Sequence, residues 1–173
     1  MEKKEELGKE KTDVLTMMNE IEIRKKDHFM RTFDRANDNF QRIFGSLFKK
    51  GKAALQLDNE KNPFDDGLSI KVKLTGNRYL DIKSLSGGEK TLTALSFIFA
   101  IQEYQPSSFY ILDEVDAALD KQNSETLSRL VRNYSDRAQY ILISHNDALI
   151  SEADTLFGIS MNEGVSKVTS LRI

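Results

Sequence analysis

The chain has 173 residues, 39% of them hydrophobic, a size typical of one domain that can bury a core. Its 25 basic and 27 acidic residues give a formal charge of −2, so net charge neither favours nor excludes a nucleic-acid partner. Cysteine is absent, which excludes a disulfide framework and a thiolate metal site. No window approaches the roughly 20 apolar residues of a membrane span, so we expect a cytoplasmic chain.

Residues 1–48 have the pattern of a helix. Leu7, Val14 and Ile21 repeat every seven residues, although lysines interrupt the same seam elsewhere. From residue 29 the apolar positions widen into an aromatic stripe that suits a globular core. We therefore expect a coiled-coil stem over residues 1–28 and a globular domain over residues 29–173. The alternative is one amphipathic surface helix with a solvated charged end.

An antiparallel hairpin is expected after this helix. Residues 53–57 suit a short strand, and the Asn, Asp, Pro and Gly residues of 58–67 suit a loop. Apolar and polar residues alternate over 68–74, the period of a half-buried strand. A turn at 75–78 would join this strand to a second one at 79–83.

Beyond residue 85 the pattern changes to that of an α/β fold. A helix that is apolar on nearly every face ends before Pro106. The continuous apolar runs 109–112 and 140–143 predict two parallel strands, each covered on both faces, joined by a helix of about fifteen residues from Lys121. A short helix at 147–153 and strands near 155–160 and 165–171 complete the prediction, with a turn at Glu163-Gly164.

Polar side chains follow both apolar strands. Asp113 and Glu114 end the first, and Ser144 and His145 end the second, at the edge where parallel sheets bind ligands. Asp113 suits Mg²⁺ reached through water, Glu114 suits the activation of a water molecule, and His145 suits a phosphoryl oxygen or that water. Taken singly, Asp113 could instead be a turn cap and His145 a satisfied loop residue.

The segment 85–90, with the sequence LSGGEK, opens the apolar helix. Unpaired N–H groups and the helix dipole favour an anion such as phosphate at this point. Ser86 and Glu89 also have the spacing of a capping box, which would only start the helix. A capping box does not require the paired glycines Gly87 and Gly88, and these favour close approach by a ligand.

The phosphate cradle GxxxxGK[ST], which nucleotide hydrolysis by such a sheet would require, does not occur in the sequence. Candidate catalytic carboxylates and a phosphate-facing helix are therefore present without the loop that would hold a nucleotide.

These segments resemble a known family. LSGGEK at 85–90, FYILDEVDAALD at 109–120 and ISHN at 143–146 are similar to the signature motif, Walker B motif, D-loop and switch histidine of ABC-type ATPases. The DEVDAALD form, preceded by FIFAIQ at 97–102, is most similar to prokaryotic, archaeal-type SMC proteins. The resemblance runs from about residue 29 to the C-terminus. It implies the C-terminal half of an ABC-type P-loop ATPase head, preceded by the base of a coiled-coil stem.

The resemblance also implies a role for each matching residue, with ATP and Mg²⁺ as cofactors. Ser86, Gly87, Gly88 and Glu89 would meet an ATP held by a second head, and Asp113 would help to hold Mg²⁺ in its own head. Glu114 would activate water, His145 would sense the γ-phosphate, and Asp120 would act across the dimer interface. These roles are assigned to the following positions: Ser86, Gly87, Gly88, Glu89, Asp113, Glu114, Asp120 and His145.

The partners implied by the resemblance are an N-terminal SMC head lobe that carries Walker A, a second SMC head, a kleisin subunit and DNA. The function would be ATP-driven chromosome condensation and segregation at the nucleoid. In the family one kleisin end contacts a head and the other contacts the coil, and both surfaces stay open for this chain. We expect the chain to be inactive as an ATPase without the Walker A lobe.

Three other hypotheses remain at this point. The chain could be a head lobe of a double-strand-break repair ATPase, although those usually have Pro where this chain has Val115. Asp113, Glu114, Asp116 and His145 could form the metal site of a phosphodiesterase, which would leave the paired glycines unexplained. The first 48 residues could be a helical interaction module attached to an inert domain.

Overall fold

The structure, a computed structural model, describes residues 2–49, 51–74, 76 and 78–171. The chain forms two compact units, Met1–Tyr79 and Leu80–Ile173, which are described separately. The first contains helix α1 (Glu2–Leu47) and strands β1 (Lys52–Leu57) and β2 (Leu68–Lys73). None of the helices in the described part of the chain has the length and apolar character that crossing a membrane requires.

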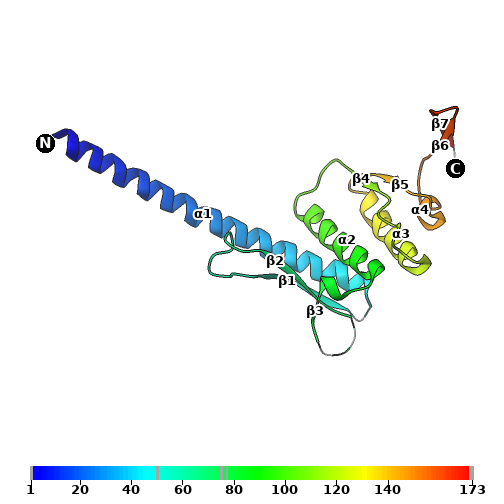
Figure 1. Cartoon of the computed structure of the whole chain (residues 1–173), viewed down its shortest axis with the longest axis horizontal. Helices are drawn as coiled ribbons and strands as arrows, with labels where there is room; N and C mark the ends of the chain where they lie inside the picture. The colour runs from blue at the N-terminus through cyan, green and yellow to red at the C-terminus, as the bar shows by residue number, and fades with distance from the viewer. Residues whose placement is uncertain (1, 50, 75, 77, 172–173) are drawn as a thin grey trace. The chain divides into compact units, whose positions relative to one another are not determined.

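The aromatic stripe of α1 forms the core of the first unit. Ala36, Phe40, Ile43 and Phe44 are all less than 9% exposed. Figure 1 shows β1 and β2 alongside the C-terminal part of α1, and the Asn37 side chain accepts a hydrogen bond from a β1 amide at 2.8 Å. The prediction that the aromatic stripe packs into a globular core is confirmed for these four residues.

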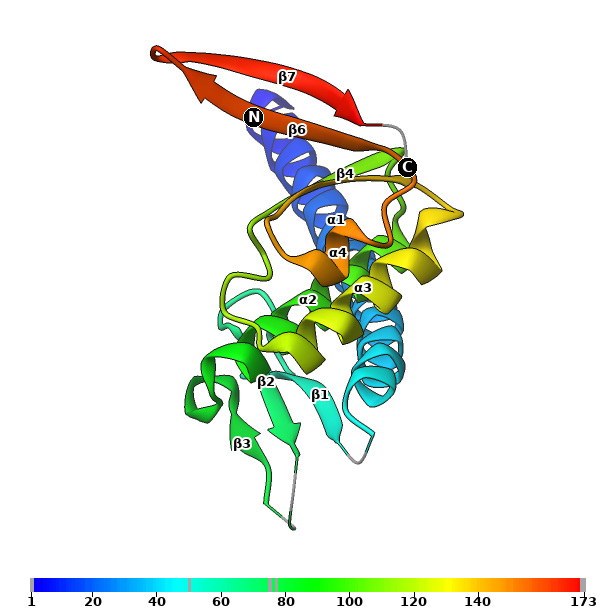
Figure 2. The ribbon, with the colours of Figure 1, turned by 90° about the vertical axis from the view of Figure 1, so that its right-hand side faces the viewer.

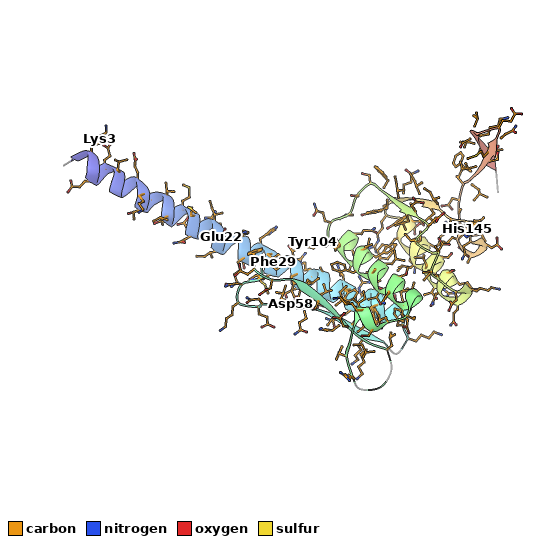
Figure 3. All side chains as sticks on the ribbon, viewed as in Figure 1. Lys3, Glu22, Phe29, Asp58, Tyr104 and His145 are labelled. Atoms are coloured by element: carbon orange, nitrogen blue, oxygen red, sulfur yellow. The ribbon has the colours of Figure 1, made fainter. Side chains whose placement is uncertain are left out.

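The N-terminal part of α1 is exposed over its described side chains up to residue 28. Leu7 and Ile21 of the seven-residue repeat are 59% and 55% exposed. In Figure 3 the side chains around the labelled Lys3 project from the helix. The coiled coil therefore stays a prediction, since its apolar seam has no partner among the described residues.

The antiparallel hairpin of the first unit joins β1 to β2, with Lys52 opposite Lys73 and Leu57 opposite Leu68. Its loop packs on α1 through Phe64, whose ring centroid lies 5.0 Å from that of Phe29. This hairpin contains the strands expected at 53–57 and 68–74 and the loop expected between them at 58–67.

The second predicted strand, 79–83, is wrong over most of its length. β3 covers only Leu80–Asp81, and the 3₁₀ helix η1 (Ile82–Ser84) follows. The Asp81 carboxylate accepts the Lys83 amide at 3.0 Å, so a local cap ends the extended backbone. Of the expected turn, Thr75 and Asn77 lie outside the described residues, while Gly76 has a positive φ of 71°.

The second unit has the predicted α/β order. It contains α2 (Gly87–Tyr104), β4 (Phe109–Asp113), α3 (Lys121–Ser135), β5 (Gln139–Ile143), α4 (Asp147–Ile150), β6 (Leu156–Asn162) and β7 (Val165–Leu171). β4 and β5 are parallel, and β6 and β7 form an antiparallel hairpin through the predicted Glu163-Gly164 turn. Figure 2 shows α2 and α3 side by side, and the β6–β7 hairpin, which follows α4 in the chain, lies apart from both.

The prediction that β4 and β5 are covered on both faces is wrong for this chain. Phe109, Ile111 and Ile143 are 55%, 58% and 50% exposed, whereas Leu112 is 7% exposed. Successive side chains of a strand point to opposite faces, so one face is open. Parallel sheets occur almost only with both faces covered, so an open face is unusual for a parallel pair of strands.

Candidate functional site

The two parallel strands end side by side, as predicted. Asp113 is the register partner of Ile143, and the Glu114 amide extends the ladder by donating to the Ile143 carbonyl at 2.9 Å. Asp113, Glu114 and His145 are all exposed at this edge, and Figure 3 labels His145 there. The structure thus brings the three candidate residues of the two strand ends to one edge of the sheet.

Glu114 adopts a left-handed backbone conformation with a φ of 46°. This region is disfavoured for residues other than glycine and costs of order 1–3 kcal/mol when it is strained. The conformation is held by the bond to Ile143 and by the Glu114 carbonyl, which accepts the Ala117 amide at 3.1 Å. Strain of this kind collects at functional sites, which favours a role for the Glu114 carboxylate.

The segment 86–89 forms the N-terminus of α2 and contains the capping box. Glu89 Oε2 accepts both the Ser86 amide, at 2.8 Å, and the Ser86 hydroxyl, at 2.7 Å. The capping interpretation is therefore confirmed, and it stands beside the ligand-binding one. A phosphate that approaches Ser86 would compete with the Glu89 carboxylate for the same two donors.

The two neighbouring glycines, Gly87 and Gly88, have different surroundings. A Cβ built on Gly87 meets nothing within 4 Å, so that side of the helix start is open to a ligand. A Cβ on Gly88 would lie 3.2 Å from Asn123 Nδ2 and 3.3 Å from the Ala118 carbonyl oxygen. A side chain at position 88 would therefore be tightly packed against these two neighbours, which favours glycine there. This packing places the start of α2 beside the loop that precedes α3.

Asp120 ends that loop as the N-cap of α3. Its Oδ1 accepts the Asn123 amide at 2.8 Å, which satisfies one of the free donors of the helix start. Asp120 is exposed, so its second oxygen can still serve another group. No hydrogen bond or ion pair among the described residues joins Asp120 or the segment 86–89 to the edge with Asp113 and His145.

Sequence reasoning missed a buried polar network beside this edge. Asp116 is only 5% exposed, and its Oδ2 accepts the Ser144 hydroxyl at 2.8 Å. Asn146 lies next in the network, with its side-chain amide donating to Ser124 Oγ at 2.9 Å. The signal available in the sequence was the second aspartate of DEVD and the serine and asparagine that flank His145.

The structure does not support the metal site of a phosphodiesterase. No group of three His, Asp or Glu side chains that could hold a metal occurs within the described residues. Asp116, one of the four residues of that hypothesis, is buried and bonded to Ser144 instead. The exposed carboxylate of Asp113 suits Mg²⁺, because Mg²⁺ usually keeps several waters and binds one or two carboxylates together with phosphates.

A cavity of about 160 Å³ lies elsewhere in the unit, beside the first residues of β4 and β5. Tyr110, Tyr134 and Tyr140 line it, and the Tyr140 hydroxyl donates to Gln102 Oε1 at 2.8 Å. Burial, with smaller contributions from Tyr110 and Tyr134, raises the pKa of the Tyr140 phenol. The cavity is thus at the opposite strand ends from Asp113 and Glu114.

A protein-family model described as "RecF/RecN/SMC N terminal domain" matches residues 4–167. The chain belongs to this family. It is 42% identical over 173 residues to the chromosome partition protein Smc of Methanocaldococcus jannaschii and 44% identical over 171 residues to that of Pyrococcus furiosus. The chain spans only about 15% of the length of these relatives.

Solved structures agree with this membership. The Smc head domain of Pyrococcus furiosus, with an extended coiled coil and bound to the C-terminal domain of ScpA, matches with a TM-score of 0.88 and 45% identity, over 98% of this chain and 43% of that one. A chain from work on ATP-driven dimerization and DNA-stimulated activation of SMC ATPases matches with a TM-score of 0.78 and 44% identity, over 84% and 89%. The predicted SMC resemblance and head-type fold are confirmed, and the repair-ATPase alternative is not favoured.

Proposed function

We propose that this chain is the C-terminal half of an SMC ATPase head, with residues 1–28 as the base of the coiled coil and residues 29–173 as the lobe. The observation that carries the proposal is the open apolar face of β4 and β5 at Phe109 and Ile111, beside the exposed carboxylates Asp113 and Glu114. A lobe carrying GxxxxGK[ST] would cover this face and bring the missing phosphate cradle to the carboxylates.

Two comparisons support a half head. Almost all of this chain corresponds to 43% of the solved Pyrococcus head chain. In the second structure the match covers 89% of the solved chain, so that separate polypeptide is close to this one in length.

In the assembled head Asp113 would hold Mg²⁺, which neutralises phosphate charge when bound. Glu114 would orient and activate the attacking water, and His145 would donate a hydrogen bond to the γ-phosphate. Ser86 and Gly87, with Gly88 and Glu89 behind them, would meet the γ-phosphate of an ATP held by a second head. Asp120 would act across that interface.

The cellular role that we propose is chromosome condensation and segregation, carried out on DNA with a kleisin subunit in the cytoplasm at the nucleoid. The relatives named as chromosome partition proteins support this role, and so do the solved SMC heads with ScpA bound. ATP-driven association of two heads is supported by the second solved structure described above.

The experiment measures ATP hydrolysis by this chain alone and after addition of an SMC lobe that carries GxxxxGK[ST]. We expect no turnover by the chain alone, turnover by the mixture, and its loss with Glu114→Gln. Glu60→Gln, an exposed glutamate of the β1–β2 loop, is the matched control and keeps full activity. Turnover by the chain alone would overturn the proposal.

A further inference from the structure

The carboxylate of Asp116 joins the two loops that carry the candidate catalytic residues. It is 5% exposed and accepts the Ser144 hydroxyl at 2.8 Å. The Ser144 oxygen in turn accepts the Asn146 amide at 2.9 Å. One hydroxyl group therefore fixes the backbone on both sides of His145 and ties it to the loop that begins at Glu114.

The network continues into the helices behind the site. Asn146 Nδ2 donates to the fully buried Ser124 of α3 at 2.9 Å, and Asn146 Oδ1 accepts the Ala148 amide of α4 at 3.0 Å. On the other side the Asp116 carbonyl accepts the Leu119 amide at 2.9 Å. These bonds connect the two loops to α3 and α4. Removing one member leaves another polar group buried without its partner.

We propose that Asp116 and Ser144 are positioning residues of the hydrolysis site, which lock Glu114 and His145 into one arrangement. The inference rests on the proposed function. Asp116 lies two residues after Glu114, and Ser144 directly precedes His145. The left-handed backbone of Glu114 persists only where its surroundings hold it, and the Asp116–Ser144 bond lies in the adjoining turn. Asp116 is buried, and the Ser144 hydroxyl donates its proton to Asp116. Neither side chain is therefore available to contact ATP, and both residues act through their neighbours.

The test compares variants in the complete head assembled from this chain and the Walker A lobe. Ser144→Ala removes the donor, and we expect kcat to fall about 10- to 100-fold, while KM for ATP and ATP-dependent association of heads stay unchanged. Asp116→Ala should give the same loss, and the double variant should be no worse than either single one, because the two residues act as a pair.

Conservative variants separate positioning from mere stability. Ser144→Thr keeps the hydroxyl and Asp116→Asn keeps an acceptor oxygen, so both should restore most of kcat. Ser144→Cys keeps a weak hydrogen-bond donor and should give a kcat between those of the wild type and Ser144→Ala. If Ser144→Ala does not fold, Ser144→Cys takes its place in the comparison. The matched control is Ser128→Ala, since Ser128 is 3% exposed and its hydroxyl has no hydrogen-bond partner among the described residues. It should keep the wild-type kcat.

The outcomes distinguish this inference from the proposed function. A wild-type kcat in Ser144→Ala, or a loss of kcat in Ser128→Ala equal to that in Ser144→Ala, overturns the inference. The proposed function still stands in that case if Glu114→Gln inactivates the head. Hydrolysis that survives Glu114→Gln overturns the function itself, whatever the serine variants do.

Discussion

Glu114 combines a candidate catalytic side chain with a backbone conformation that favours glycine. Its φ of 46° is strained for a residue with a side chain. We expect Glu114→Gly to raise the free energy of unfolding of the isolated chain by about 1 kcal/mol, because glycine adopts this region without the steric cost. The same change should abolish hydrolysis in the assembled head. Chemical denaturation and an ATPase assay measure the two effects.

Glu163 provides the matched control for this prediction. It also has a positive φ, 52°, but lies in the β6–β7 turn away from the strand ends. Glu163→Gly should give a similar gain in stability and leave ATPase activity unchanged. A loss of stability in Glu114→Gly would show that its conformation carries no strain.

The raised pKa of Tyr140 predicts a loss of stability at alkaline pH. Burial, with Tyr110 and Tyr134 adding to it, raises the pKa of the folded phenol above the ordinary value of about 10. Above that pH the unfolded chain loses the proton first, so the folded chain binds more protons and the free energy of unfolding falls as pH rises. Below about pH 10 both states are protonated and the full stability is present.

Denaturation curves from pH 8 to pH 11 test this prediction. The decline above about pH 10 should be less steep in Tyr140→Phe than in the wild type. Tyr79→Phe, at a tyrosine that is 49% exposed, is the control and should keep the wild-type slope. Identical slopes in wild type and Tyr140→Phe would contradict the prediction.

At this scale the sequence predicted the residues whose position follows from a strand. Asp113, Glu114 and His145 were identified because parallel strands end at one edge, and the structure places them there. Asp116 and Ser144 were not identified as a pair, because a contact between two loops leaves no periodic pattern in the sequence. The long-range pairing of loop side chains depends on packing that only the folded chain defines.

The capping box of α2 is the clearest prediction at the scale of an element. Ser86 accepts the Glu89 amide and donates to the Glu89 carboxylate, so Ser86→Ala should lower the free energy of unfolding of the isolated chain by about 1 kcal/mol. Ser86→Asn keeps a capping side chain and should retain most of the stability. Chemical denaturation measures both variants. Ser84→Ala, at an exposed serine before the helix, is the control, and equal stabilities of Ser84→Ala and Ser86→Ala would argue against the cap.

Helices were predicted more accurately than short strands. α1 and α3 lie within one or two residues of the expected bounds, because long periodic patterns and caps define them. The strand expected at 79–83 was reduced to Leu80–Asp81, since the Asp81 side chain favours a local turn. The long loop between β1 and β2 was predicted at 58–67, because its Asn, Asp, Pro and Gly residues favour turns.

At the scale of the whole molecule, the sequence predicted more burial of the β4–β5 sheet than the chain itself provides. The apolar runs of β4 and β5 indicated burial on both faces, yet Ile111 and Ile141 are 58% and 43% exposed. Under the proposed function, the apolar composition of these strands reflects burial in the assembled head. The difference between the predicted and the observed burial therefore marks the surface on which we propose that a further lobe binds.

This surface gives a prediction about assembly. Ile111 is 58% exposed, so Ile111→Glu should leave the free energy of unfolding of the isolated chain nearly unchanged. In the complex the same glutamate would be buried without a partner, which is strongly unfavourable, so binding of the Walker A lobe should be lost. Ile23→Glu, at a 69% exposed position of α1 off the Leu7–Ile21 seam, is the matched control and should bind as the wild type does. Calorimetric titration with the lobe measures both, and wild-type affinity in Ile111→Glu would show that this face is covered by something else.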